Sequence, residues 1–350
     1  FKNVIVNGIV MAEDGKKMSK RLQNYTPPDA LMEEYGADAL RLYLINSGLV
    51  KGEEQRFSDA GVKDMVRRAL LPWFNSFKFL QTYAGIDSWK AEADPAAPVN
   101  ITDQWILSRL QTLKANVAKE MADYKLYNVM PVLFEFIEDL TNWYIRLNRS
   151  RFWVEGSNDD KHAAYQTLYT TISELTMCMA PFAPFLAEHI YQELAVFTGE
   201  SSSRDISVHL VSYPEAEEPL IQPVLEQAVS RMQNIILLGR QKRNQVKIKT
   251  KTPMATLTII HEDQTMLDEI ARLENYIESE LNIKTIAYST DKDKYINLYA
   301  KPNLPVLGKR FGKEMNKFRQ LIQELDGKQL NQLQEDGSLT LEGESFSTED

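Results

Sequence analysis

The stretch Gly15-Lys16-Lys17-Met18-Ser19-Lys20-Arg21 carries more information about this chain than any other segment. It places three lysines and an arginine in a short polar turn, directly after the apolar run Val4-Ile5-Val6-Asn7-Gly8-Ile9-Val10. That run predicts a buried strand, so the basic residues are expected to form a loop at its end. Lysine ammonium groups in such a loop can stabilise negative charge on phosphoryl oxygens. Taken alone, a solvated basic turn would explain the same residues.

Length and composition describe an ordinary globular protein of two or three domains. The 350 residues are 43% hydrophobic and 25% charged, with a net charge of −9. No apolar run reaches the length of about 18 residues that a membrane span needs, so no membrane partner is expected. The single cysteine, Cys178, and four scattered histidines predict no zinc site and a reducing compartment, the cytoplasm. Because the chain is acidic, any contact with nucleic acid requires a local basic cluster.

Helix signals dominate the chain from Thr26 onward. Thr26 and Thr102 stand where the N-terminal caps of two helices are expected, Gly36 is placed to end the first of these, and Pro72 predicts a kink in a longer helix. Apolar residues recur at steps of three and four through the middle of the chain, which predicts a bundle of four or five helices. The expected helices cover residues 29–35, 37–45, 58–83, 102–121, 133–147, 162–179 and 184–194.

The pattern changes after about residue 220. A helix over 223–244 is followed by the β-branched run 255–260, which predicts a strand. The helix and strand patterns that follow this run predict a small α+β domain. Its remaining expected elements are helices at 266–281 and 309–325 and strands at 285–288 and 295–300.

Several segments, taken in order, resemble one family. They are Lys17-Met18-Ser19-Lys20-Arg21, Asn24-Tyr25, Tyr35-Gly36-Ala37-Asp38-Ala39-Leu40-Arg41, Trp73-Phe74-Asn75, Asn142-Trp143-Tyr144-Ile145-Arg146 and Arg149-Ser150-Arg151-Phe152-Trp153. The series is similar to the class I aminoacyl-tRNA synthetases for aliphatic amino acids, and most of all to isoleucyl-tRNA synthetases of the eukaryote-like type. The resemblance covers essentially the whole chain. Arg21 stands where many relatives have serine, and the family's His-x-Gly-His signature and side-chain pocket have no counterpart here. Since the chain also begins with Phe1, we expect a C-terminal fragment.

The resemblance implies a reaction and roles for the loop residues. Isoleucine and ATP, with Mg²⁺, would form an aminoacyl-adenylate, and the acyl group would then pass to tRNA(Ile). By the same resemblance, Lys20 binds the ATP phosphates and stabilises the transition state, and Lys17 is the second candidate. Met18 would orient the loop by packing, and Ser19 would contribute a hydroxyl to ATP binding. The isolated chain is expected to be inactive.

Two basic segments are candidates for contact with tRNA. On a helix, Asn142, Arg146, Arg149 and Trp153 share one face, opposite a face that suits the core. Arginines beside aromatic residues suit phosphate contact and stacking on anticodon bases, which makes Arg146, Arg149, Arg151 and Trp153 candidate tRNA-binding residues. Ion pairs of Arg146 and Arg149 with Glu135, Glu138 or Asp139 are the alternative.

The second segment is the run 240–251, which contains no acidic residue. It is the best local footprint for phosphate in this acidic chain, with Arg240, Lys242 and Arg243 as candidate contacts. The alternative is a solvated helix end.

These observations predict a mainly α fold that combines three parts: the end of a Rossmann-like nucleotide-binding domain, a helical anticodon-binding region and a small α+β domain. The expected divisions are a catalytic remnant at 1–26, a stem-contact connection at 27–65, the anticodon-binding bundle at 66–205, a linker at 206–222 and the C-terminal domain at 223–350. Whether this last domain is truncated is left open. The alternatives for function are a valyl- or leucyl-tRNA synthetase, or a tRNA-binding module without catalysis.

Overall fold

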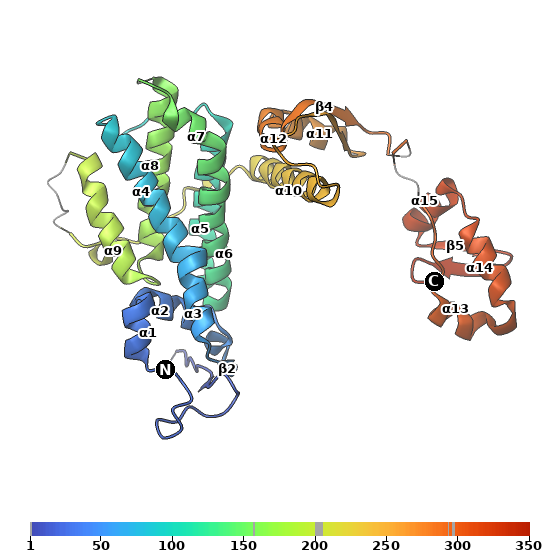
Figure 1. The fold of residues 1–350 in the computed structure, drawn as a ribbon, viewed down its shortest axis with the longest axis horizontal. Helices are drawn as coiled ribbons and strands as arrows, with labels where there is room; N and C mark the ends of the chain where they lie inside the picture. Colours follow the sequence, from blue (N-terminus) through green and yellow to red (C-terminus); the bar gives the residue numbers. More distant parts are fainter. Residues whose placement is uncertain (1, 157, 200–205, 293, 296–297) are drawn as a thin grey trace. The chain divides into compact units, whose positions relative to one another are not determined.

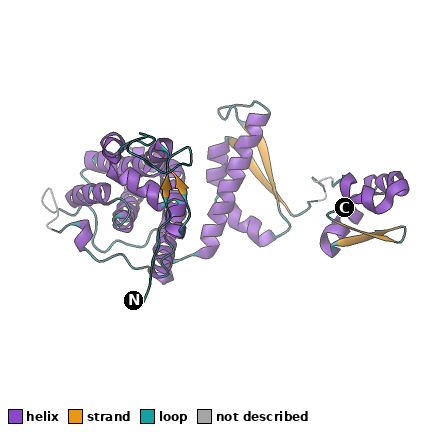
Figure 2. Ribbon diagram, turned by 90° about the horizontal axis from the view of Figure 1, so that it is seen from below, coloured by secondary structure: helices purple, strands orange, loops and turns teal. Residues whose placement is uncertain are grey.

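The computed structural model describes residues 2–156, 158–199, 206–292, 294–295 and 298–350. The chain folds into two compact units, Phe1–Gln227 and Ala228–Asp350, and the first is almost entirely helical (Figures 1 and 2). No helix among the described residues is both long and apolar enough to cross a membrane.

A helical bundle forms most of the first unit (Figure 1). Its helices are α4 (Leu71–Ile86), α5 (Ile101–Ala122), α6 (Leu126–Glu138), α7 (Arg146–Trp153), α8 (Asp159–Met179) and α9 (Pro184–Glu193). The long helix α5 packs on both α6 and α8, and α4 also packs on α8. The bundle core contains the fully buried rings of Trp73, Phe77, Trp105, Tyr144 and Tyr165. The predicted bundle is therefore confirmed.

Shorter elements lie at one end of this bundle. They are β1 (Val10–Met11), α1 (Pro28–Tyr35), α2 (Ala37–Ile45), β2 (Gln55–Arg56) and α3 (Asp59–Met65). The strands β1 and β2 pair in parallel over two residues each. The loop between β1 and α1 contains the basic stretch and projects from this end (Figure 1).

The prediction of a buried strand over residues 4–10 is wrong. Val4, Ile5 and Val6 are 64–78% exposed, and only Val10 belongs to a strand. A strand with an apolar sequence is buried only where other strands flank it and other elements cover its faces. Among the described residues, the two-residue β2 is the only paired strand beside it.

The expected caps also differ from the observed ones. The hydroxyl of Thr26 donates to Asp59 Oδ2 at 2.6 Å instead of capping α1, which begins after Pro27. At α5 the cap is Asn100, whose side chain accepts from the backbone N–H of Thr102. Gly36 does end α1 with a positive φ of 85°, but its ψ of 152° lies outside the left-handed helical region.

π-helical turns join consecutive helices at two places in the first unit. The first, Val66–Leu70, connects α3 to α4 and precedes Pro72. Proline lacks the N–H of a regular helical bond, and a wider turn accommodates that loss without ending the helix. The second, Asp139–Ile145, joins α6 to α7 and carries the buried residues Trp143 and Tyr144.

The second unit is a small α+β structure, as predicted. Helix α10 (Pro223–Gln245) runs across the unit boundary and is followed by β3 (Met254–Ile260), α11 (Gln264–Ala271), α12 (Glu274–Leu281) and β4 (Ile283–Ser289). Strands β3 and β4 pair in parallel. One continuous helix was expected here. The structure has two, α11 and α12, because the helix is interrupted at Arg272 and Leu273.

The last part of the chain has its own apolar cluster. Its elements are α13 (Leu304–Phe311), α14 (Met315–Gln323), α15 (Gly327–Asp336) and the hairpin of β5 (Ser338–Leu341) and β6 (Glu344–Ser347). Leu307, Phe318, Ile322 and Phe346 form the cluster. The strand expected at 295–300 includes residues 296–297, which lie outside the described residues, and the described residues of that range form no strand. The expected helix at 309–325 is two helices, and α15 with the hairpin was not predicted.

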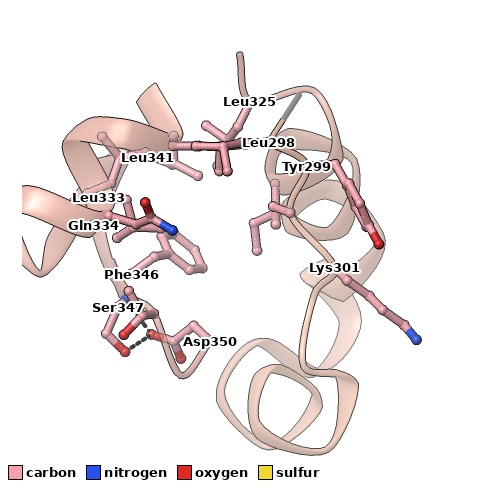
Figure 3. A pocket seen from close by; sticks show the side chains of 15 residues that line it. Leu298, Tyr299, Lys301, Leu325, Leu333, Gln334, Leu341, Phe346, Ser347 and Asp350 are labelled. Atoms are coloured by element: carbon pink, nitrogen blue, oxygen red, sulfur yellow. Dashed lines mark hydrogen bonds between the residues drawn. The ribbon is translucent and has the colours of Figure 1, made fainter. Parts of the chain in front are cut away.

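A cavity of about 250 Å³ lies in this last part (Figure 3). Aliphatic side chains such as Leu298, Leu333 and Leu341 line it, and the ammonium group of Lys301 points away from it (Figure 3). Ser347 and Asp350 hydrogen-bond to each other at its edge. With an apolar lining and no converging catalytic groups among the described residues, the cavity is not an active-site candidate.

Candidate functional site

The basic loop begins with a tight turn after β1. Met11 and Lys17 form an antiparallel bridge, and the backbone N–H of Ala12 donates to Lys16 O at 2.8 Å. Gly15 occupies the turn with a φ of 80°, a conformation that other residues adopt only with strain. The turn brings the chain back on itself, so Lys17 starts a second loop beside the strand end.

The side chain of Asn24 closes that second loop. Its Oδ1 accepts from the backbone N–H of Ser19 at 2.9 Å, and its Nδ2 donates to Lys17 O at 3.2 Å. Lys17 and Lys20 are exposed, whereas Met18 and Ser19 are partly buried. Neither Lys17 nor Lys20 forms an ion pair with a residue that the structure describes. The structure therefore brings together all four predicted loop residues and leaves both ammonium groups available to a phosphate.

A cavity of about 440 Å³ lies at the base of the loop. One wall comes from Ala12, Glu13 and the segment 23–26, and the other from residues 57–60 at the start of α3. The hydrogen bond between Thr26 and Asp59 joins the two walls. The loop is thus fastened at its base to the helical part of the unit, while its lysines face solvent.

Arg151 is engaged inside the bundle. Its guanidinium donates to Asp103 through two bonds of 2.7 and 2.8 Å, and it also donates to Asp160 and Asn148. Asp103 is fully buried and additionally accepts from the hydroxyl of Tyr144 at 2.8 Å. Burial by itself would lower the pKa of Arg151, but the hydrogen bonds and charge of Asp103 and Asp160 raise it above its ordinary value. These partners occupy the guanidinium N–H groups, so Arg151 links α5, α7 and α8 within the bundle, and the prediction that it contacts tRNA stays a prediction.

The other residues of this segment are divided as the helical pattern predicts. Asn142, Arg146, Arg149 and Trp153 are exposed, with Trp153 54% accessible, while Trp143 and Tyr144 are in the core. Arg149 forms no hydrogen bond or ion pair with any described residue. Two of the expected alternative partners, Glu135 and Asp139, pair with Arg109. Asp139 and Arg146 each make further interactions, so the alternative of an internal ion pair stays open for Arg146.

The basic run 240–251 is organised around a buried arginine. Arg243 is 6% exposed and donates to the carbonyl oxygens of Lys249, Thr252, Leu281 and Asn282. Arg240 is partly buried and pairs with Glu280. Both arginines therefore hold the local fold, and the phosphate-binding character predicted for the run rests on its lysines.

Four lysines of the run are exposed: Lys242, Lys247, Lys249 and Lys251. The turn that carries three of them is tied by Arg243 and by Asn282, whose Nδ2 donates to Thr250 O at 3.0 Å. These hydrogen bonds hold the backbone of the turn, so the lysines extend into solvent from a defined path of the chain. Sequence reasoning named Lys242 as a candidate contact but not the other three, whose exposure was not evident from the run alone.

Three further titratable residues, Asp38, Arg41 and Cys178, are engaged or buried within the fold. Asp38 caps α9 by accepting from the backbone N–H groups of Phe185 and Leu186, and Arg41 donates to the carbonyl oxygens of Pro181 and Phe182. Burial raises the pKa of Asp38, against the effect of those two N–H groups. Burial also raises the pKa of the Cys178 thiol to about 12, which makes it unreactive.

Comparison with known proteins gives two family matches. Residues 1–56 match the family described as tRNA synthetases class I (I, L, M and V), and residues 103–260 match the family described as anticodon-binding domain of tRNA ligase. The first range contains the basic loop, and the second contains α7 and the run 240–251.

Curated relatives match over the whole chain. An isoleucine–tRNA ligase of Bdellovibrio bacteriovorus is 45% identical over 350 residues, which are 100% of this chain and 33% of that protein. The cytoplasmic isoleucine–tRNA ligase of Mus musculus is 42% identical, over 100% of this chain and 29% of that protein. This chain thus spans about a third of the length of these relatives. Among solved structures, a ternary complex of an Agrobacterium radiobacter K84 LeuRS with tRNA and LeuAMS covers 62% of this chain and is itself covered over 24%, with a TM-score of 0.48 and 22% identity.

Proposed function

Because this chain belongs to the isoleucine–tRNA ligase family, we propose that the protein containing it activates isoleucine with ATP and transfers it to tRNA(Ile). Within that enzyme, this chain supplies the phosphate-binding loop and the anticodon-binding region. The proposed divisions are 1–26, 27–65, 66–205, 206–222 and 223–350, within which residues 1, 157, 200–205, 293 and 296–297 lie outside the described part of the chain. The mouse relative is named cytoplasmic, which supports the cytoplasm as the site of action.

The geometry of the basic loop is the observation that carries this proposal. Lys20 and Lys17 stand exposed and without carboxylate partners among the described residues, on a loop held by Asn24. When the isoleucine carboxylate attacks the α-phosphate of MgATP, negative charge develops on the phosphoryl oxygens and on the departing pyrophosphate. Lys20 stabilises that charge, Lys17 assists it, Met18 packs beneath the loop and Ser19 offers its hydroxyl.

Isoleucine-dependent exchange of pyrophosphate into ATP, measured with the full-length enzyme, tests the proposal. We expect exchange with isoleucine to exceed exchange with valine or leucine at equal concentrations. Preferred exchange with valine or leucine would instead identify a valyl or leucyl enzyme. Binding of tRNA without any exchange would identify a tRNA-binding module.

The exposed face of α7 is the proposed anticodon contact. Arg146, Arg149 and Trp153 combine two cations with an accessible indole ring on which a base can stack. The test compares binding of tRNA(Ile) with that of the same tRNA carrying another anticodon, at one fixed salt concentration. Equal affinities would refute anticodon recognition by this chain.

The turn that carries Lys247, Lys249 and Lys251 gives a prediction about the salt dependence of tRNA binding. Replacing Lys247, Lys249 and Lys251 together by alanine should weaken tRNA binding for all sequences and reduce the slope of log K against log salt by about one for each phosphate that the variant no longer neutralises. Titrations of binding at several salt concentrations measure this slope. Lys125→Ala is the matched control, because Lys125 is a half-exposed lysine whose ammonium already pairs with Asp123 at 2.8 Å. An unchanged slope in the triple variant would remove the turn from the tRNA interface.

A further inference from the structure

We propose that Asn24 is a positioning residue for adenylate formation, which holds the loop so that Lys20 meets the phosphates of ATP. This inference rests on the proposed function. It concerns a side chain that would not itself touch the substrate. Its effect would be transmitted through the backbone of the loop.

The bonding pattern of Asn24 is suited to this role. One carboxamide accepts from Ser19 N at 2.9 Å and donates to Lys17 O at 3.2 Å, so it closes a ring around Met18. Both partners are backbone groups, which means that the clamp sets the path of the chain and leaves the lysine side chains unengaged. Only a side chain with both a donor and an acceptor can make these two bonds.

The two hydrogen bonds of Asn24 are expected to restrain the backbone at Lys20 more than at Lys17. Lys17 is also held by its bridge to Met11 in β1, which closes the first turn. Lys20 lies only in the second loop, where the bond from Leu22 N to Ser19 O at 3.1 Å is its nearest other support. Loss of the Asn24 bonds would therefore release Lys20 more than Lys17.

The clamp has a rigid base. Gln23, just before it, has a φ of 47° and turns the chain so that Asn24 points back into the loop. Two residues further on, Thr26 donates to Asp59 at the first residue of α3. The loop is consequently positioned relative to a helix, and elements held on rigid structure orient catalytic groups more accurately than free loops do.

The test is the kinetics of isoleucine-dependent pyrophosphate exchange in the full-length enzyme. Asn24→Ala should lower kcat by roughly 10- to 100-fold, the scale of a misplaced catalytic group, with an unchanged KM for isoleucine. Asn24→Asp keeps the acceptor for Ser19 N but loses the donor to Lys17 O, so an intermediate kcat is expected. Gln23→Asn is the matched control and should match the parent, because asparagine tolerates the positive φ and the exposed Gln23 side chain does not hold the loop.

A double-mutant cycle separates positioning from general damage. Since Asn24 is proposed to act mainly through Lys20, Asn24→Ala should have little further effect once Lys20→Ala is present. Fully additive losses, or loss of tRNA binding in Asn24→Ala, would overturn the inference. Normal exchange by Asn24→Ala beside an impaired Lys20→Ala would overturn it while leaving the proposed function intact. Normal exchange by Lys20→Ala would overturn the loop's proposed function itself.

Discussion

Lys20→Ala in the full-length enzyme is expected to slow adenylate formation by about 10²–10³-fold, equivalent to about 3–4 kcal/mol of transition-state stabilisation. The reason is that Asn24 holds the backbone of the loop, and the proposed role of the Lys20 ammonium group is to stabilise the negative charge that develops on the phosphoryl oxygens. Single-turnover measurement of adenylate formation, with saturating isoleucine and ATP, gives the rate directly. Equal rates for the variant and the parent would contradict the assignment of Lys20.

Two variants make this prediction specific. Lys16→Ala removes an exposed lysine of the same loop whose ammonium pairs with Asp14 at 3.2 Å, and it should leave the rate near that of the parent. Lys20→Arg keeps the charge but changes its shape, so its rate should fall between those of Lys20→Ala and the parent. A loss of the same size in all three variants would indicate general disruption of the loop.

Arg151→Ala is expected to lower the free energy of unfolding by about 3–5 kcal/mol, because it leaves the buried carboxylate of Asp103 without its cation. Asp103 is fully buried and accepts two hydrogen bonds from Arg151, beside the one from Tyr144. Urea unfolding followed by far-ultraviolet circular dichroism measures the change. If Arg151 instead served only tRNA, the variant would unfold like the parent and bind tRNA more weakly.

Asp160→Asn is the matched control for this pair. Asp160 binds the same guanidinium group, at 2.7 Å, but its side chain is 58% exposed. An exposed ion pair contributes about 0–1 kcal/mol, so this variant should unfold close to the parent. The contrast between the two carboxylates would show that burial, and not the number of ion pairs, decides the contribution.

Local sequence patterns predicted the elements whose stability is local. The helix expected at 223–244 is α10 at Pro223–Gln245, and the helix expected at 37–45 is α2. The spacing of Asn142, Arg146, Arg149 and Trp153 predicted that their side chains lie outside the core, and all four are exposed. These results follow because the helical period fixes which side chains share a face, whatever the helix packs against.

Predictions that required a distant partner were wrong or remained open. The apolar run at 4–10 predicted a buried strand, but burial depends on neighbouring strands, and its side chains are largely exposed. Thr26 has the residue type of a helix cap, yet its hydroxyl donates to Asp59, 33 residues away. The residue types indicated that the apolar run favours burial and that the Thr26 hydroxyl favours a hydrogen bond. Only the tertiary contacts determined whether the run is buried and which group accepts from Thr26.

The sequence by itself determined the family, the helical bundle and a basic loop that presents its lysines after β1. Only the tertiary structure determined which arginines form ion pairs inside the protein and which are exposed to solvent. Arg149 and Arg151 lie two residues apart in α7, and the sequence predicted the same role for both. The fold places Asp103, 48 residues away in the chain, against Arg151 and leaves Arg149 in solvent. A guanidinium beside a buried carboxylate is held by the cost of leaving that charge unpaired, and this cost exists only once the helices have packed.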